Sequence, residues 1–158
     1  IHHSYVEESI PLILQYSNRV AEVHGHHYTE VLKINTLFNE AANELASHMK
    51  KEENILFPYI KSLLQLELAK QPLNSPPFGS INNPITMMEM EHEAVGDIFK
   101  EIARLSHNYT PPEDACNTFR ALYAKLDEFE QDLHQHIHLE NNILHPKAKQ
   151  LEQTLMNN

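Results

Sequence analysis

Apolar residues recur at alternating steps of three and four along four segments of this chain, and Phe38, Ile55, Phe99, Phe129 and Ile143 are among these expected core positions. This spacing lines up one face of a helix and is typical of helices that pack together in a bundle. Stretches rich in Gly, Pro and Asn separate the segments, near residues 25–27, 72–84 and 108–112. The sequence therefore predicts an all-α fold, an antiparallel up-down-up-down four-helix bundle, with helices over residues 2–24, 29–70, 84–107 and 111–150.

Two of the predicted helices open with start signals. Asn83 precedes Pro84, a pair expected at the N-cap and the first helical position, and Thr110 precedes Glu113 in a capping box. The chain has 158 residues, which is long enough for one compact core without disulfide bonds. We therefore expect a single domain over residues 1–158.

The apolar face of each predicted helix is interrupted by histidine, and on two helices also by a glutamate four residues further on. The interruptions are His3 and His24, then His48 and Glu52, then His92, and finally His136 and Glu140. Residues four apart lie one turn apart on the same face of a helix. Each helix is therefore expected to direct at least one histidine into the core.

The two segments that carry both histidine and glutamate resemble each other. Residues 48–58 and 136–146 are identical at six of eleven positions. Two copies of one turn predict a site with approximate twofold symmetry. Pro58 and Pro146 end the two copies inside the helical pattern, so each is expected to free a carbonyl group and kink its helix just beyond the site.

These buried polar residues indicate a metal centre, because a buried carboxylate without a partner destabilises a fold strongly. Imidazole and carboxylate ligands without thiolate favour iron or manganese over a structural zinc site. Two iron ions, each bound by two histidines and bridged by both glutamates, would occupy the whole set and leave open positions for oxygen, a bridging oxide or nitric oxide. The predicted ligands are His3, His48, Glu52, His92, His136 and Glu140.

The choice between His3 and His24 depends on helix geometry. The two residues are 21 positions apart, about 31 Å along a continuous helix, so only one of them can reach the site. His48 lies about as far beyond the first turn as His3 lies before it, so His3 is preferred and His24 is kept in reserve.

Other histidines are not assigned to the site. His134 and His138 could form a zinc clip, but they flank the apolar face and are expected to face solvent. The rest lie at predicted helix ends or kinks, namely His2, His26, His27, His107 and His145.

Composition limits the classes of function. The chain has 22 acidic and 12 basic residues and a formal net charge of -10, which argues against a nucleic-acid or anionic membrane surface. Cys116 is the only cysteine, so no disulfide or cysteine-based cluster can form within the chain, and the reducing cytoplasm is the default location. No apolar run approaches the roughly 18 residues of a membrane span, and no leader precedes the first helix, so we expect a soluble protein.

The spacing of the site residues resembles a known family. His48-x-x-x-Glu52, Glu91-His92 and His136-x-x-x-Glu140, with their Ile-Leu and Pro neighbours, look like hemerythrin-like cation-binding domains, and more narrowly like the repair-of-iron-centres proteins. The resemblance implies a hemerythrin-like bundle that binds two iron ions through the six predicted ligands, and His24 also matches a family histidine. It implies repair of iron-sulfur clusters damaged by nitric oxide or peroxide, through iron donation or removal of nitric oxide. Damaged iron-sulfur proteins would be the partners, and nitric oxide or dioxygen the small ligands.

The ligand motifs of this chain differ from those of other di-iron bundles, and these differences argue against some alternative functions. Oxygen-carrying hemerythrins place a second histidine four residues after the first on the third helix, where this chain has Gly96. Ferritin-like oxidases use two Glu-x-x-His pairs, whereas only Glu89 and His92 fit that form here. Members of the repair family usually carry a cysteine-containing domain ahead of the bundle, which we expect to be absent from this chain. A hemerythrin-like sensor or carrier of oxygen or nitric oxide without turnover is the main alternative, and a metal-stabilised structural domain is another.

Overall fold

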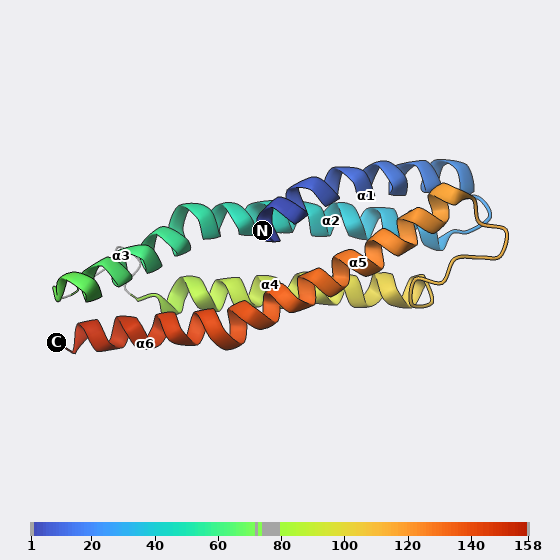
Figure 1. Ribbon diagram of the computed structural model, residues 1–158. Coiled ribbons are helices and arrows are strands. Elements are labelled where there is room, and N and C mark those ends of the chain that lie inside the picture. The colour runs from blue at the N-terminus through green and yellow to red at the C-terminus, as the bar shows by residue number, and fades with distance from the viewer. Residues whose placement is uncertain (1, 72, 74–79, 158) are drawn as a thin grey trace. The chain divides into compact units, whose positions relative to one another are not determined.

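The computed structural model describes residues 2–71, 73 and 80–157, and helices make up most of this part of the chain (Figure 1). The helices are α1 (His2–His24), α2 (Glu30–Lys51), η1 (Glu52–Leu56), α3 (Phe57–Ala69), α4 (Asn82–Leu105), α5 (Asn117–Leu139), η2 (Glu140–Leu144) and α6 (His145–Met156). The elements η1 and η2 are single turns of π-helix. The chain runs without a break from α2 through η1 into α3, and from α5 through η2 into α6. The described residues therefore form four helical rods, which confirms the predicted all-α four-helix fold.

The contacts within the chain divide it into two compact units. Unit 1 is Ile1–Leu45 with Ala94–His136, and unit 2 is Ala46–Glu93 with Ile137–Asn158. Most of the predicted break at residues 72–84 lies outside the described residues. None of the described helices is both long and apolar enough to cross a membrane.

Unit 1 is built from α1 and from residues 30–45 of α2, 94–105 of α4 and 117–136 of α5. Three phenylalanines, one from each of α2, α4 and α5, form its aromatic centre, and each is at most 1 % exposed. The ring centroids of Phe38 and Phe129 lie 5.8 Å apart and those of Phe99 and Phe129 lie 5.5 Å apart. Edge-to-face and stacked ring pairs at such distances add to the stabilisation that burial provides.

The contacts of α1 with α5 show that these two helices are antiparallel in unit 1. The hydroxyl of Tyr5 donates a hydrogen bond to Glu128 (2.6 Å), and His24, near the other end of α1, lies 3.3 Å from Cys116 just before α5. The turn into α2 depends on Gly25, because an added Cβ would lie 2.4 Å from the Ala21 carbonyl oxygen.

Unit 2 has its own apolar core, and one of its buried carboxylates connects several of its segments. The core residues come from η1, α3, α6, the start of α4 and the residue just before α4, and they are Leu56, Leu63, Ile81, Ile85, Met88, Ala148 and Leu155. Glu152 of α6 is 3 % exposed and accepts hydrogen bonds from the Tyr59 hydroxyl (2.6 Å), the Ser80 hydroxyl (2.8 Å) and the Ile81 backbone N–H (2.8 Å). This carboxylate therefore ties α3 and α6 to the residues just before α4.

The start signals predicted for two helices are wrong in detail. Helix α4 begins at Asn82, whose backbone N–H donates to the Ser80 hydroxyl (3.2 Å), so Asn83 lies inside the helix instead of capping it. Helix α5 begins at Asn117 and not near residue 111. The guanidinium of Arg120 donates to the backbone oxygens of Glu113 (2.8 Å) and Ala115 (3.2 Å), which holds the preceding segment in a non-helical path.

A left-handed turn explains why the capping box does not form. The backbone is left-handed at His107, Asn108 and Tyr109, with φ values of 53°, 58° and 61°. Residues other than glycine seldom adopt this conformation. The Ser106 hydroxyl accepts the Tyr109 backbone N–H (2.9 Å), and the Tyr109 hydroxyl donates to Glu130 (2.7 Å). These bonds direct the chain away from α4 before Thr110 is reached.

The two prolines of the repeated segment are accommodated by the π-helical turns. The backbone N–H of Phe57 donates to the carbonyl of Glu52, and that of His145 to the carbonyl of Glu140, five residues back in each case. Each π turn adds one residue to the helix directly before its proline, as a π-bulge does. The helix is therefore disturbed next to each proline, as expected, and the disturbance is a widened π-helical turn.

The added residue shifts the buried face of the helix. Ile55 and Ile143, which the sequence pattern places in the core, are 48 % and 43 % exposed. Leu56 and His145 are each 1 % exposed instead. The prediction for Ile55 and Ile143 is wrong because a constant helical period does not hold through η1 and η2.

Candidate metal centre

Four of the six predicted ligands come together in unit 2. His48 from α2, Glu52 from η1, His92 from α4 and Glu140 from η2 each offer a ligand atom, and these atoms all lie within 4.8 Å of one another. The residues are between 0 and 5 % exposed. Two carboxylates and two imidazoles this close and this buried make a suitable site for a divalent cation.

Each of the two histidines is held by an oxygen atom behind it. Nδ1 of His48 lies 3.0 Å from Oε1 of Glu91, and Nδ1 of His92 lies 3.0 Å from Oδ1 of Asn141. Protein oxygens in this position accept the Nδ1 proton and fix the orientation of the ring, as they do behind metal-bound histidines.

The other nitrogen of each ring faces a core carboxylate. Nε2 of His48 lies 2.6 Å from Glu52, and Nε2 of His92 lies 3.2 Å from Glu140. The two Nε2 atoms are themselves 3.0 Å apart. With both Nδ1 atoms protonated, two neutral rings would bring lone pairs together at this point, so the arrangement requires a proton or a metal ion there.

The charges around His48 show how a proton can fill that role. Burial by itself lowers the pKa of His48, but hydrogen bonds and charges from Glu52 and Glu91 outweigh burial and raise it above the ordinary value. Burial also raises the pKa of Glu91, but the hydrogen bonds from Lys51 (2.5 Å) and His48 outweigh it and lower the pKa overall. A metal ion at Nε2 would take the place of the His48 proton, which is the usual competition between metal and proton for imidazole.

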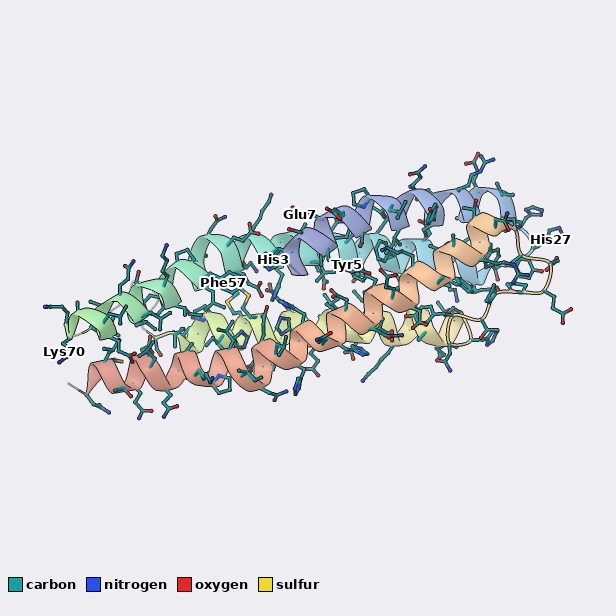
Figure 2. All side chains as sticks on the ribbon, viewed as in Figure 1. His3, Tyr5, Glu7, His27, Phe57 and Lys70 are labelled. Atoms are coloured by element: carbon teal, nitrogen blue, oxygen red, sulfur yellow. The ribbon has the colours of Figure 1, made fainter. Side chains whose placement is uncertain are left out.

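The other two predicted ligands lie together in unit 1. The ring centroids of His3 and His136 are 6.1 Å apart, and both side chains are partly exposed. Figure 2 shows His3 near the beginning of α1 and His27 beyond the other end of that helix. His24 is near that second end, with Nε2 3.3 Å from the Cys116 sulfur and its ring 5.4 Å from the Phe119 ring. Of the two histidines on the apolar face of α1, His3 is thus the one beside His136.

The remaining histidines divide as follows. His134 and His138 are exposed, as expected, and so are His26, His27 and His107. His145 is different, because it is 1 % exposed and lies 3.5 Å from Glu140. The sequence pattern assigned it to a kink, since the register shift at η2 was not anticipated.

The residues behind the ligands were also not identified from the sequence. Glu91 and Asn141 each directly neighbour a predicted ligand, and they lie on different helices from the rings that they contact. A polar residue next to a ligand is a weak signal by itself. Only the packing of α2 against α4, and of α4 against η2, brings each oxygen to its Nδ1 atom.

A helical bundle whose buried turns bring two histidines and two glutamates within ligand distance belongs to the class of cation-binding helical domains. The sequence matches the family model of the hemerythrin HHE cation binding domain over residues 1–148. The chain therefore belongs to the hemerythrin HHE cation-binding family, as the resemblance found in the sequence implied.

Curated relatives point to a narrower group. The chain is 40 % identical over 147 residues to the iron-sulfur cluster repair protein YtfE of Yersinia pseudotuberculosis serotype IB (strain PB1/+). It is equally similar to the protein of that name from Yersinia pestis (strain Pestoides F). The matched region is 93 % of this chain and 61 % of either relative. The chain thus spans less than two thirds of the length of these relatives.

Proposed function

We propose that this chain is a non-haem di-iron domain that takes part in repairing iron-sulfur clusters damaged by nitrosative or oxidative stress. The observation that carries the proposal is the buried cluster of His48, Glu52, His92 and Glu140, in a chain similar to iron-sulfur cluster repair proteins. The partners would be damaged iron-sulfur proteins, and the location would be the cytoplasm.

The proposed ligands are six residues, four in unit 2 and two in unit 1. Those of unit 2 already lie within ligand distance of one another. His3 and His136 are included because their rings neighbour each other in unit 1, and because His136 precedes Glu140 by four residues as His48 precedes Glu52. Glu52 and Glu140 would bridge two iron ions, with two histidines on each ion.

The protein residues would prepare the site before iron arrives. Glu91 and Asn141 would keep the Nδ1 protons of His48 and His92, so that each Nε2 atom offers its lone pair to the metal. Burial of the two carboxylates would exclude water and strengthen their attraction for cations. When bound, iron would supply open coordination positions for nitric oxide or dioxygen, or would itself be given to a damaged cluster.

An optical experiment tests the proposal against the alternatives. Protein loaded with iron under reducing, anaerobic conditions is exposed separately to nitric oxide and to oxygen. We expect rapid reaction with nitric oxide, or transfer of iron to an apo iron-sulfur protein, in keeping with repair. A stable and reversible oxygen adduct would instead identify a carrier, and retention of iron with no response to either gas would identify a structural metal.

A further inference from the structure

Three histidines are buried in the described part of the chain, and one of them is outside the predicted ligand set. His48, His92 and His145 are 3 %, 5 % and 1 % exposed. All three lie in unit 2. The third is the least exposed, yet no motif in the sequence gives it a role.

The surroundings of His145 repeat those of the two predicted ligands. Its Nδ1 atom lies 3.3 Å from Oε1 of Glu89, as the Nδ1 atoms of His48 and His92 lie against Glu91 and Asn141. Its Nε2 atom faces Oε2 of Glu140 at 3.5 Å. The ring is nearly parallel to that of His92, with an interplanar angle of 3° and centroids 6.1 Å apart.

The distance between His145 and Glu140 fits two ligands of one metal ion better than a hydrogen bond. The 3.5 Å separation exceeds the roughly 2.9 Å of an ordinary N–H···O bond. Among the described residues, the buried Nε2 atom of His145 has no hydrogen-bond partner. Two ligand atoms that are each about 2.1 Å from a tetrahedral ion lie about 3.4 Å apart.

The acceptor behind the ring determines which nitrogen is available. If the carboxylate of Glu89 accepts the Nδ1 proton, the neutral ring presents the lone pair of Nε2 toward Glu140. Two electron-rich atoms then face each other in a buried place, which is unfavourable unless a proton or a metal ion lies between them, and the 3.5 Å separation is long for a shared proton. The Glu89 side chain is 38 % exposed, so this side of the arrangement reaches solvent.

We propose that His145 is a further metal-binding residue, which holds a divalent iron ion together with Glu140 beside the main centre. This inference rests on the proposed function, since Glu140 also belongs to the main set of ligands. It gives iron donation a structural basis, because an ion held by Glu140 and His145 would lie on the side of the buried centre that faces the partly exposed Glu89. Glu89 is a positioning residue that acts through His145.

Metal titration of matched variants tests the inference. His145→Phe introduces the residue found at the equivalent position 57 of the repeat, and His134→Phe makes the same change at an exposed histidine. Metal-free protein is titrated anaerobically with Fe²⁺ and the bound metal is counted. We expect wild-type protein and His134→Phe to bind one equivalent more than His145→Phe. Equal binding by all three proteins would overturn the inference.

A second measurement observes the imidazole directly. With Zn²⁺ as a diamagnetic probe, the nitrogen NMR signal of Nε2 in His145, assigned in the wild-type protein through bonds from the His145 backbone, should move to the position of a metal-bound nitrogen. Glu89→Ala should weaken this binding by about 10–100-fold, and Glu89→Gln by less, because an amide oxygen can still accept the Nδ1 proton. An unchanged signal at saturating zinc would overturn the inference even if His145→Phe failed to fold.

The same titration separates this inference from the proposed di-iron centre. Loss of only the His145-dependent equivalent, with two others retained, supports both. If every protein binds two equivalents of Fe²⁺, the main centre is supported and the role of His145 in binding metal is rejected. Fewer than two equivalents outside the His145 position would reject the di-iron centre, while a His145-dependent equivalent would still stand.

Discussion

Nδ1 of His48 and Oε1 of Glu91 lie 3.0 Å apart, although Glu91 follows His48 by 43 residues in the chain. Glu91 also accepts a hydrogen bond from Lys51 at 2.5 Å. Two residues of α2, His48 and Lys51, therefore hold the Glu91 carboxylate of α4. This contact fixes the His48 ring with Nε2 toward Glu52. The orientation of a predicted ligand thus depends on a residue that is not itself a ligand.

Replacing Glu91 should weaken metal binding without removing any ligand. We expect Glu91→Ala to lower the affinity by about 10–100-fold, as the loss of an acceptor behind a metal-bound histidine does. Glu91→Gln should have a smaller effect, because its amide oxygen can accept the same proton. Competition with a chelator of known affinity measures the change, and Glu93→Ala, at an exposed neighbour, is the control. Equal affinities for Glu91→Ala and Glu93→Ala would contradict the orienting role.

Glu52 and Glu140 should be required for the second iron ion. Both carboxylates occupy equivalent positions in the repeat and both are buried, at 0 % and 3 % exposure. In the His145→Phe background, which lacks the proposed additional ion, we expect either substitution with Ala to reduce bound iron to one equivalent or less, as measured by elemental analysis. Retention of two equivalents by both variants would rule out bridging.

His3 and His24 should behave differently although both lie on the apolar face of α1. His3 neighbours His136 and His24 neighbours Cys116. His3→Ala should lose metal and lower the melting temperature of the iron-loaded form, because metal bound only by the folded state adds to its stability. His24→Ala and Cys116→Ser should retain iron. The reverse result would show that the helix register at the start of the chain is wrong.

The metal-free protein should be more stable on the acidic side of neutrality through His48. The folded-state pKa of His48 is raised above its ordinary value of 6.5, so the folded state holds this proton more tightly than the unfolded state does. The resulting stabilisation is fully present below about pH 6.5 and is lost as the pH rises through the folded-state pKa. Urea unfolding of metal-free wild-type protein and His48→Gln across this range measures it.

The difference in unfolding free energy between the two proteins should shrink as the pH rises. Metal binding should show the opposite dependence, because the ion replaces the His48 proton and binds more tightly at higher pH. A stability difference that grows with pH would contradict the raised pKa.

Glu152 should contribute to stability whether or not metal is bound. Glu152→Ala removes the acceptor of the buried Ile81 N–H and of the hydroxyls of Tyr59 and Ser80. Leaving a buried donor without an acceptor costs about 1–3 kcal/mol. Urea unfolding should therefore show that the free energy of unfolding falls by at least about 1 kcal/mol. Glu67→Ala, at an exposed position of α3, is the control and should change little. A loss seen only in iron-loaded protein would instead connect Glu152 with the metal.

The sequence was sufficient for the fold class and for most of the core. Periodicity alone identifies Phe38, Phe99 and Phe129 as core residues, and the structure buries all three. It succeeds there because these stretches are regular α-helix, in which the spacing of residues determines the face they occupy. The same reasoning brings together His48, Glu52, His92 and Glu140.

Periodicity failed where the helix departs from its usual period. Ile55 and Ile143 are misplaced because each follows the beginning of a π turn, and the burial of His145 was missed for the same reason. The proline after each turn signals a disturbance, but it does not specify whether the helix bends or widens. Contacts such as those of Glu91 with His48 depend on packing between helices, which no spacing within one helix encodes.

The π turns also determine which mutations in length the chain can tolerate. An α-helix rotates by about 100° per residue, and each π turn takes up one additional residue without passing that rotation on to the helix beyond it. Deleting one residue between Glu52 and Pro58, or between Glu140 and Pro146, would therefore leave a regular α-helix with Leu63 or Glu152 still on the inner face of unit 2. The same deletion in the regular helix that follows would turn the residues beyond it by about 100°. The two π turns are thus the places in these helices where the chain can lose a residue and keep its buried face.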